Sequence, residues 1–359
     1  KLIDKAEDIK YELDKALYIA LSGRKGPVLL DLPMDIQREE INPETLIGYS
    51  GESILNNPLI AWEEIRLLME SSHRPMLLLG AGCCNSDMVL LNDFIRRHHF
   101  PVITSLMGRG AIDETYDNYI GMIGSYGNRC ANMGVANADL LIALGTRLDT
   151  RQTGARLDQF LSNGHIIHVD IDDNELEYHR LLNRKKVNCT IDCFLQKEKE
   201  MPISLGDISE WNFFLHGLKQ RYGQDAEIER FVENKSPYRF MQYFDSLTQT
   251  DDVICADIGQ NQMWAAQTLR LKSGQKFVTS GGLAPMGFSL PVAIGCSFAN
   301  PNKKVFSING DGGFHMAIQS LMLISQYNLP IKVIILNNAS LGMITQFQHL
   351  YFDDRMCGT

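Results

Sequence analysis

Short apolar runs alternate with amphipathic stretches along most of the chain. The apolar runs predict buried strands over residues 28–32, 76–79, 101–104, 140–144, 166–171, 253–256, 305–308 and 331–336. Apolar residues recur at helical spacing over residues 62–70, 88–98, 290–299 and 316–327, and the first residues predict an amphipathic helix that ends near Gly23. Strands that alternate with helices are typical of parallel sheets covered by helices on both faces. We therefore expect α/β domains of the doubly wound type.

Shifts in composition divide the chain into blocks. Residues 1–38 hold one helix and one strand, which cannot bury a core of their own, so we expect them to be the end of a domain. Residues 39–59 form a linker, and residues 60–197 form a complete series of strands and helices. Residues 198–236 are polar and predict a connector with one helix, and residues 237–359 form a third block. The pattern still continues at Thr359, so we expect a chain that is incomplete at both ends.

Composition and charge exclude several classes of partner. The net charge of −9 gives no electrostatic support to a nucleic-acid groove. No apolar run approaches the roughly 20 residues that span a bilayer, and the first residues do not have the layout of a signal peptide. The eight cysteines include no CxxC pair, which favours reduced thiols over disulfides or zinc. We expect a cytoplasmic protein that binds neither nucleic acid nor membrane.

A glycine-rich turn follows the strand predicted at 305–308. Gly310, Asp311, Gly312 and Gly313 stand at the carboxyl end of this strand, before a helix that we expect to begin near Phe314. Open parallel sheets bind ligands at this edge. Glycines allow the backbone to approach a diphosphate closely, and free amides at the start of a helix favour anionic oxygens. Asp311 is then a hard oxygen ligand placed beside phosphates, which suits Mg²⁺.

A second polar turn, Asn337-Asn338, follows the strand predicted at 331–336. Asp311 and Asn338 are 27 positions apart, which is enough for one helix and one strand between adjacent strand ends. Mg²⁺ prefers near-octahedral oxygen coordination, which a carboxylate and an amide oxygen can begin. Each turn alone is often merely structural. Together they predict a site for magnesium and a diphosphate.

Two further turns are candidates for phosphate binding in the second block. Arg147, Asp149 and Arg151 alternate just past the strand at 140–144. Arginine suits bidentate binding of phosphate or carboxylate, but a salt-bridged surface loop is the alternative. Gly80 and Gly82 follow the strand at 76–79, although a dinucleotide fingerprint has a third glycine where this chain has asparagine. A tight turn explains these two glycines equally well.

The GDG turn followed, after 24 residues, by Asn337-Asn338 resembles the pattern of thiamine-diphosphate enzymes. Among thiamine-diphosphate enzymes, the catalytic subunit of acetolactate synthase (acetohydroxyacid synthase) is the one that several segments of this chain resemble, and these segments occur in that family's order. These segments are residues 22–37, 105–113, 120–127, 138–154, 257–267, 279–295 and 337–348. The resemblance therefore covers nearly the whole chain.

The resemblance implies three doubly wound domains. Residues 1–38 would end the pyrimidine-binding domain, residues 60–197 would be a central FAD-binding domain, and residues 237–359 would be most of the diphosphate-binding domain. It implies a transferase that decarboxylates pyruvate and joins the two-carbon unit to a second 2-oxo acid, giving 2-acetolactate for branched-chain amino-acid biosynthesis. It also implies a homodimer or homotetramer and a possible small regulatory subunit. The glutamate that activates the cofactor would lie upstream of Lys1 and come from the neighbouring subunit.

The resemblance also assigns roles to individual residues. Diphosphate contacts fall on Gly259, Gln260, Asn261, Gly310, Asp311, Gly312, Gly313 and Gly342, and magnesium ligands on Asp311, Asn338 and the backbone carbonyl of Ser340. Met286 would hold thiamine diphosphate in its bent form, and Met343 would border it. The FAD contacts would be Arg24, Gly80, Ala81, Gly82, Thr104, Ser105, Leu106, Met107, Gly121, Gly124, Gly145, Arg147, Asp149, Asp170, Ile171, Asp192 and Cys193. Arg151 would receive the carboxylate of the second 2-oxo acid.

Three positions depart from the family's pattern. Asn261 stands where histidine is usual, and Met34 stands where lysine is common. Phe347 stands where many synthases have the tryptophan tied to 2-oxobutyrate preference, so we expect a site that does not strongly favour that acceptor. Two alternatives stay open, namely a related lyase or carboligase with a keto-sugar or acyl-CoA acceptor, and a non-catalytic paralogue.

Overall fold

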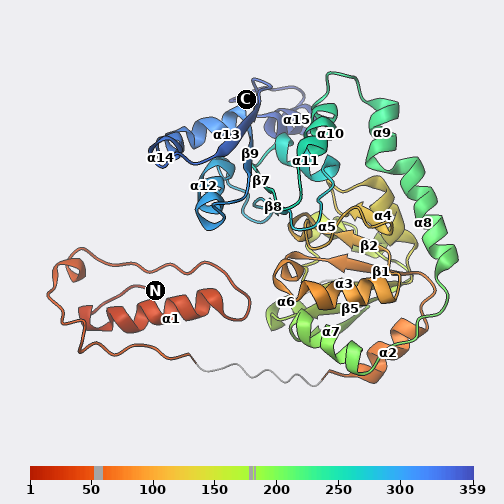
Figure 1. Ribbon diagram of the computed structural model, residues 1–359, viewed down its shortest axis with the longest axis horizontal. Helices are drawn as coiled ribbons and strands as arrows, with labels where there is room; N and C mark the ends of the chain where they lie inside the picture. The colour runs from red at the N-terminus through yellow and green to blue at the C-terminus, as the bar shows by residue number, and fades with distance from the viewer. Residues whose placement is uncertain (52–59, 178–180, 182) are drawn as a thin grey trace.

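The computed structural model describes residues 1–51, 60–177, 181 and 183–359. It contains two separate sheets, and every strand pairing in both is parallel. The expected α/β architecture is therefore confirmed (Figure 1).

The first sheet has the strand order β3-β2-β1-β4-β5-β6. Its strands are β1 (Pro75–Leu79), β2 (Val102–Thr104), β3 (Tyr119–Met122), β4 (Leu140–Leu144), β5 (His165–Asp170) and β6 (Arg184–Asn188). Because side chains alternate across a strand, Leu77 and Leu79 of β1 enter one core while Met76 and Leu78 enter the other. This central strand is buried on both faces, as the continuous apolar run predicted.

Helices cover both faces of this sheet. One face carries α2 (Trp62–Glu70), α3 (Met88–Arg97) and α7 (Ile191–Glu200), and the other carries α4 (Arg129–Asn137) and α8 (Ser209–Tyr222). Short helices lie in the loops, namely η3 (Ala81–Asn85), η4 (Leu106–Gly108), α5 (Thr150–Thr153), η5 (Leu157–Gln159) and α6 (Asp173–Glu177).

The second sheet has the order β10-β9-β7-β8. Its strands are β7 (Val253–Ala256), β8 (Lys276–Val278), β9 (Val305–Gly310) and β10 (Ile331–Leu336). Helices α10 (Pro237–Leu247) and α11 (Gln260–Thr268) pack on one face, and α12 (Ser289–Ala299) packs on the other. The remaining helices are α13 (Asp311–Met316), η6 (Ile318–Ser320), α14 (Leu321–Gln326) and α15 (Gly342–Tyr351).

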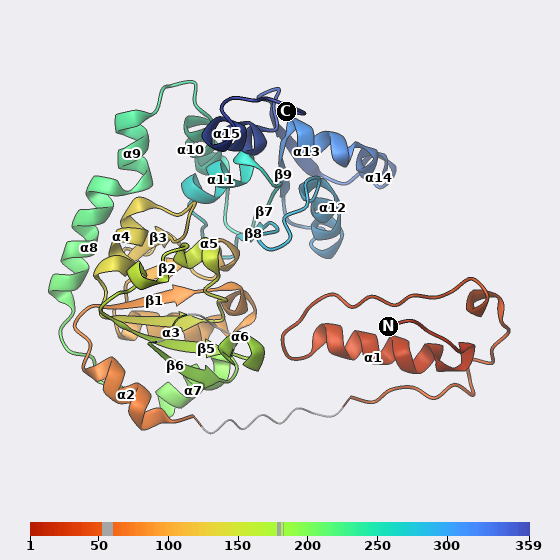
Figure 2. The ribbon, with the colours of Figure 1, turned by 180° about the vertical axis from the view of Figure 1, so that it is seen from behind.

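Most of the first 51 residues lie apart from the two sheets in both views, but Arg24, in the loop after α1, reaches Glu175 of α6 (Figures 1 and 2). They contain η1 (Ala6–Asp8), α1 (Ile9–Leu21) and η2 (Ile36–Arg38). Their only core is a small cluster of Ile3, Ala6 and Ile36. The linker predicted at 39–59 falls partly on residues 52–59, which lie outside the described residues.

Several expected elements are corrected by the structure. Residues 28–32 do not form a strand, because among the described residues this segment has only one bridge, between Leu2 and Asp31, and Leu29 is exposed. The helix after the glycine-rich turn begins at Asp311 rather than near Phe314. Residues 316–327 do not form one continuous helix, because η6 stands between α13 and α14. Strands β3, β6 and β8 were not predicted from the sequence, because none of them is a long apolar run. β3 contains a glycine, β6 is polar and β8 has three residues.

The connector expected over 198–236 contains two helices instead of one, α8 and α9 (Gln224–Phe231). Trp211, Leu215 and Leu218 of α8 are buried in the core of the first sheet. This stretch therefore covers one face of that sheet and then leads along the side of the molecule to α10 (Figure 2). In the described part of the chain, no helix is long and apolar enough to cross a membrane.

Candidate functional site

The ends of three neighbouring strands form the first candidate site. In the second sheet, Ala256 of β7 pairs with Ile308 of β9, and Gly310 of β9 pairs with Leu336 of β10. The loops that follow these strands therefore emerge side by side at the carboxyl edge of the sheet. The expectation that Asp311 and Asn338 stand at adjacent strand ends is confirmed.

Oxygen atoms without partners gather at this edge. Asp311 Oδ1, Asn309 Oδ1 and Asn261 Oδ1 are buried, and none has a hydrogen-bond partner in the described part of the structure. A buried oxygen left without a partner costs about 1–3 kcal/mol, so such groups call for a missing ligand. Hard oxygen donors of this kind fit Mg²⁺. Asp311 also opens α13, where the amides of the helix start favour an anion.

Asn338 is held toward this position by its neighbours. Its Nδ2 donates to Oε1 of Gln260 at 3.1 Å, and its Oδ1 accepts the backbone N–H of Ser340 at 3.3 Å. An amide oxygen with a second lone pair can still ligate a cation. Asn338, Ser340, Gln260 and Gly342 line an open hollow beside α15.

Two glycines allow this close approach of backbone and side chains. A Cβ on Gly342 would lie 2.1 Å from Gln260 Oε1, and a Cβ on Gly312 would lie 2.5 Å from Leu341 Cδ2. Gly259, which precedes α11, has a φ of +127°, a conformation that side chains rarely adopt. Glycine at positions 312 and 342 therefore lets the loops at this edge of the sheet pack closely against one another.

Asp257 fixes the loop that carries Met286. This fully buried carboxylate follows β7 and accepts the backbone N–H groups of Gly287 at 3.2 Å and Phe288 at 2.8 Å. Met286 lies against the glycine turn, because a Cβ on Gly312 would be 3.5 Å from its Cε. No role was predicted for Asp257, although an acid directly after a strand and two positions before a glycine is a recognisable signal.

Helix α15 carries the two other residues assigned to this site. Met343 is half-buried, whereas Phe347 is 55% exposed and packs against Tyr351 with ring centroids 4.7 Å apart. Both lie on the helix that starts at Gly342, but neither lines the hollow beside Asn338. The residues of this helix that line it are Gly342, Thr345, Gln346, His349 and Leu350.

A second candidate site is a groove on the first sheet, with a volume of about 520 Å³. It opens at the carboxyl ends of β1 and β4, where the strand order reverses and ligands bind in such sheets. The predicted FAD residues that line it are Arg24, Ala81, Gly82, Ser105, Met107, Gly145, Arg147, Asp149, Asp170, Ile171 and Asp192. The structure thus brings together segments that are more than 160 positions apart in the sequence.

Other predicted FAD residues lie beside or away from this groove. Gly80 packs beneath it, since a Cβ there would lie 2.1 Å from the carbonyl oxygen of Gly145, and Thr104 is fully buried. Leu106 and Cys193 flank residues that line the groove but are not themselves part of its lining. Gly121 and Gly124 are not part of the lining either. Gly121 lies in the edge strand β3, whereas Gly124 packs against α5, since a Cβ on it would be 3.3 Å from Cα of Gln152, which lines the groove.

Ion pairs hold the two arginines at the mouth of the groove. Arg24 Nη1 donates to Asp172 Oδ2 at 2.7 Å and to Glu175 Oε1 at 2.8 Å, and Arg147 Nε lies 2.9 Å from the same Glu175 oxygen. The hydrogen bond from Arg24 lowers the pKa of Asp172, whereas burial raises the pKa of Asp170. Glu175 was missed in the sequence analysis, because nothing in the pattern of α6 separates it from other exposed acids.

The groove meets the second sheet at one edge. Asp149 caps α5 by accepting the N–H groups of Arg151 at 3.0 Å and Gln152 at 3.2 Å. Arg151 Nη1 then donates to the carbonyl of Gly281 at 2.5 Å, and Gly281 itself lines the groove. The loop that carries Met286 therefore also borders the FAD groove.

Comparison with known proteins agrees with this geometry. Residues 63–192 match the family model "Thiamine pyrophosphate enzyme, central domain", and residues 257–359 match "Thiamine pyrophosphate enzyme, C-terminal TPP binding domain". "Acetolactate synthase 2, chloroplastic" of Nicotiana tabacum is 36% identical over 98% of this chain and 54% of its own length. "Acetolactate synthase large subunit" of Porphyra purpurea is 34% identical over 97% of this chain and 60% of its own length. "Acetolactate synthase, chloroplastic" of Arabidopsis thaliana is 35% identical over 98% and 53%.

The chain spans between 53% and 60% of the length of these relatives. The central match contains all six strands of the first sheet. The C-terminal match begins directly after β7 and contains β8, β9 and β10, with Asp311 and Asn338. The chain therefore belongs to the thiamine pyrophosphate enzyme family and is similar to acetolactate synthase.

Proposed function

We propose that this chain supplies the diphosphate-binding, magnesium-binding and FAD-binding parts of an acetolactate synthase. The enzyme would decarboxylate pyruvate and join the two-carbon unit to a second 2-oxo acid. The observation that carries this proposal is the unpartnered carboxylate oxygen of Asp311 beside Asn338 at adjacent ends of parallel strands. The similarity to acetolactate synthases supports the choice of reaction.

In this proposal, Asp311, Asn338 and the backbone carbonyl of Ser340 hold Mg²⁺, with diphosphate oxygens filling further positions. Residues 259–261, 310–313 and Gly342 surround the diphosphate. Thiamine diphosphate supplies the carbanion chemistry when bound, and the protein supplies position and electrostatics. Met286 supports the cofactor from the side of the glycine turn, consistent with its contact near Gly312.

Arg151 would bind the carboxylate of the second 2-oxo acid. Arginine suits this task because its planar guanidinium donates two parallel hydrogen bonds to a carboxylate. Its side chain is exposed and is oriented by the carbonyl of Gly281, in the loop that leads to Met286. This arrangement supports a position for the acceptor between the two domains.

The groove on the first sheet would hold FAD, with Arg24 and Arg147 at its mouth. The domains are assigned in the same way. Residues 1–38 would end a pyrimidine-binding domain, and residues 60–197 would form the FAD-binding domain. Residues 198–236 would connect this domain to the diphosphate-binding domain, which residues 237–359 would form. We extend the proposal to a homodimer or homotetramer in which the neighbouring subunit completes the cofactor site.

The test supplies pyruvate to the protein that carries this chain, with thiamine diphosphate, Mg²⁺ and FAD, and measures acetolactate. We expect acetolactate from the natural protein, none from Asp311→Asn, and unchanged product from the surface variant Asn302→Ala. Pyruvate consumed without acetolactate would instead indicate a carboligase with another acceptor. No consumption in the presence of bound cofactors would indicate a non-catalytic paralogue. Either result would overturn the proposal.

A further inference from the structure

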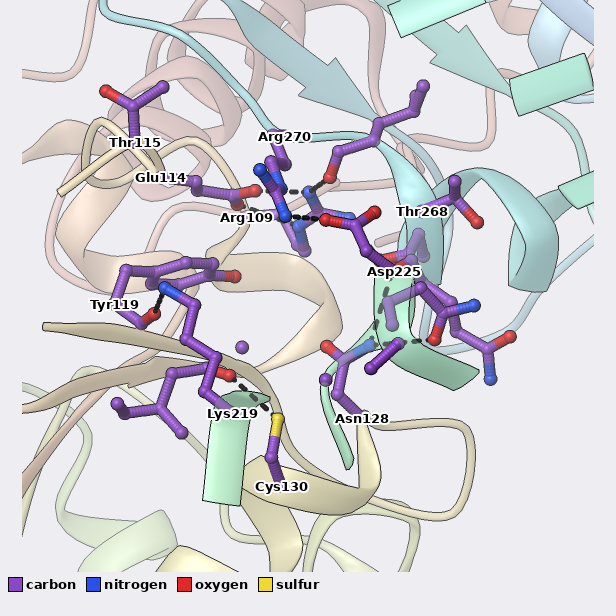
Figure 3. A pocket seen from close by; sticks show the side chains of 18 of the residues that line it. Arg109, Glu114, Thr115, Tyr119, Asn128, Cys130, Lys219, Asp225, Thr268 and Arg270 are labelled. Carbon is purple, nitrogen blue, oxygen red and sulfur yellow. Dashed lines mark hydrogen bonds and ion pairs between the residues drawn. The ribbon is translucent and has the colours of Figure 1, made fainter. Parts of the chain in front are cut away.

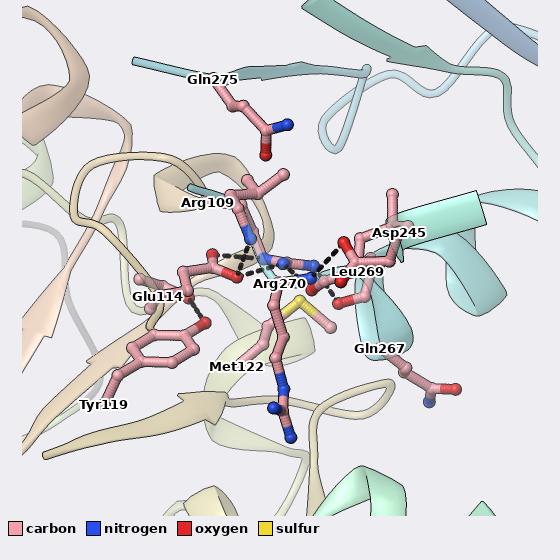
Figure 4. A network of polar contacts seen from close by, with 12 residues as sticks. Arg109, Glu114, Tyr119, Met122, Asp245, Gln267, Leu269, Arg270 and Gln275 are labelled. Carbon is pink, nitrogen blue, oxygen red and sulfur yellow. Dashed lines mark hydrogen bonds and ion pairs between the residues drawn. The ribbon is translucent and has the colours of Figure 1, made fainter. Parts of the chain in front are cut away.

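A buried arginine of the central domain reaches across to the C-terminal domain. Arg109 follows η4 and is only 3% exposed. Its Nε donates to Glu114 Oε1 at 2.8 Å and its Nη2 to the carbonyl of Leu269 at 2.5 Å. Nη1 also donates to the carbonyl of Ala266, and Nη2 to Glu114 Oε2 (Figure 4). Burial opposes the charge of Arg109, but the carboxylate of Glu114 raises its pKa, so the guanidinium stays protonated.

Glu114 is bound to the C-terminal domain from the other side. Its backbone N–H donates to the carbonyl of Leu271 at 2.8 Å, and its Oε2 accepts the N–H of Leu271 at 3.1 Å. Tyr119 lies against Glu114, and its hydroxyl is 3.0 Å from Thr104 Oγ1 at the end of β2 (Figure 4). A continuous polar network therefore runs from the central sheet to residues 266–271.

The carbonyls that Arg109 binds belong to the end of α11. The last carbonyls of a helix have no partner within the helix, and a cation there is stabilised by the helix dipole. The other end of α11 is Gln260, which is hydrogen-bonded to Asn338 in the diphosphate site. At nine residues, α11 is about 13 Å long, and this single helix connects the carbonyls that Arg109 binds to Gln260. A shift at Leu269 would therefore reach Gln260 through the helix.

Arg109 also lies near the FAD groove. It stands two positions after Met107, which lines that groove. Met107 lies within helix η4, which Arg109 follows directly, and Ser105 Oγ caps this helix by accepting the N–H of Gly108 at 3.1 Å. Met107 also lies against Gly281, since a Cβ on that glycine would be 2.8 Å from its Sδ. Any ligand that fixes Met107 therefore fixes the base of Arg109.

The end of α11 borders a cavity on the side of Arg109 and Glu114. The cavity has a volume of about 320 Å³ and is lined by residues of both domains and of the connector (Figure 3). Its walls are largely polar, with Asn128 from the start of α4, Lys219 from α8 and Arg270 after α11. Leu269 packs in the core of the second sheet, but on the side of the cavity the hydrogen bonds of Arg109 and Glu114 hold the helix end where packed side chains would otherwise do so.

We propose that Arg109 and Glu114 are positioning residues that couple the FAD groove to the diphosphate site. Occupancy of the groove orders η4, and the pair passes that order to α11 and its contact with Asn338. The identity of the two ligands rests on the function proposed above. Coupling between two sites is reciprocal, so each ligand must raise the affinity of the other by the same factor.

The experiment measures the dissociation constant of thiamine diphosphate, with Mg²⁺, in the absence and presence of saturating FAD, and then the reverse pair. Three proteins are compared by calorimetry and flavin fluorescence: the natural protein, the double variant Arg109→Met/Glu114→Gln, and the control Arg97→Met/Glu198→Gln. Replacing both members of a buried pair is often tolerated, whereas removing one leaves a buried charge. The control removes a second ion pair of the central domain, one that joins α3 to α7.

We expect each ligand to strengthen the other by about fivefold or more in the natural protein and in the control. In the Arg109/Glu114 variant, each ligand should still bind alone, with mutual strengthening below about twofold. If this variant does not fold, Arg109→Lys carries the same test, because lysine keeps the positive charge beside Glu114 but cannot reproduce the forked hydrogen bonds.

Two results would overturn the inference while leaving the proposed function standing. One is that both ligands bind the natural protein independently. The other is that the coupling survives in the variant, or is lost equally in the control, which would make it a general effect of stability. Failure of the natural protein to bind either ligand would remove the proposed function together with this inference.

Discussion

Asn338 Nδ2 donates a hydrogen bond to Oε1 of Gln260 at 3.1 Å, and this contact joins the loops that follow β10 and β7. The strand between them, β9, carries Asp311 at its end. The carboxylate is therefore flanked on both sides by amide groups whose positions depend on each other.

The close approach of these amides requires glycine at position 342. In Gly342→Ala the new Cβ would lie 2.1 Å from Gln260 Oε1 and 2.9 Å from Asn338 Nδ2, so the two side chains must separate. We expect thiamine diphosphate to bind at least about tenfold more weakly, a loss of about 1.4 kcal/mol. The matched control is Gly295→Ala in α12, where a Cβ would meet nothing within 4 Å. Equal affinity in both variants would show that this contact does not shape the site.

The unpartnered oxygen of Asp311 predicts dependence on a metal ion. Asp311→Asn keeps the shape of the side chain but removes the negative charge that a divalent cation needs. We expect the binding of thiamine diphosphate to lose its dependence on Mg²⁺ in this variant, as measured by calorimetry with and without a chelator. Retained magnesium dependence would assign the metal to other oxygens.

Glu175 holds both Arg24 and Arg147 at the FAD groove. Glu175→Ala removes the carboxylate that the two guanidinium groups share, and we expect FAD to bind about tenfold more weakly, a loss of about 1.4 kcal/mol. Quenching of flavin fluorescence measures this affinity. Glu177→Ala is the control on the same helix, because Glu177 pairs only with Lys186 at the surface among the contacts described. If both variants bind FAD like the natural protein, Glu175 has no part in the groove.

The ion pair of Glu198 predicts how stability depends on pH. Burial would raise the pKa of Glu198, but hydrogen bonds from His98 and Arg97 outweigh it and lower the pKa to about 2. A depressed carboxyl pKa stabilises the fold above its unfolded value of about 4.5, and this stabilisation is lost as pH falls from 4.5 toward 2.

Glu198→Gln should therefore lower the free energy of unfolding by about 3 kcal/mol at pH 7, and the difference should shrink below pH 4.5. Denaturant unfolding of the natural protein and the variant, at pH 7 and below pH 4.5, measures this difference in the free energy of unfolding. Glu63→Gln, which removes a solvent-exposed partner of Arg66, should change little at either pH. A constant difference across the range would contradict the assignment.

The phenylalanine at position 347 leads to a prediction about whether the enzyme prefers pyruvate or 2-oxobutyrate as the acceptor. Its ring is 55% exposed on α15, and it stands where many acetolactate synthases have tryptophan. In the protein that carries this chain, competition between pyruvate and 2-oxobutyrate should show no strong preference for 2-oxobutyrate. Phe347→Trp should raise that preference several-fold, whereas Phe352→Trp, just beyond the same helix, should not. A strong preference in the natural protein would refute the prediction.

The sequence by itself determined the parts of the fold that local patterns encode. Strands such as β4, β7 and β10 are continuous apolar runs bounded by polar turns, so their limits could be predicted residue by residue. It was also predictable that Asp311 and Asn338 follow adjacent strand ends, because consecutive parallel strands joined by a helical connection place their carboxyl ends together. Residues 28–32 show the limit of this reasoning, since an apolar run becomes a strand only where a partner strand pairs with it.

Only the tertiary structure decided which distant residues meet. Glu175 joins Arg147 to Arg24, which is 151 positions away from it, and Arg109 reaches the carbonyl of Leu269, which is 160 positions away. No periodicity in the sequence encodes these two long-range contacts. It also decided that Gly121 lies away from the FAD groove, since strand order and not chain order sets distance across a sheet. Local sequence sets the preference of each segment, but contacts between domains depend on how the sheets are finally packed together.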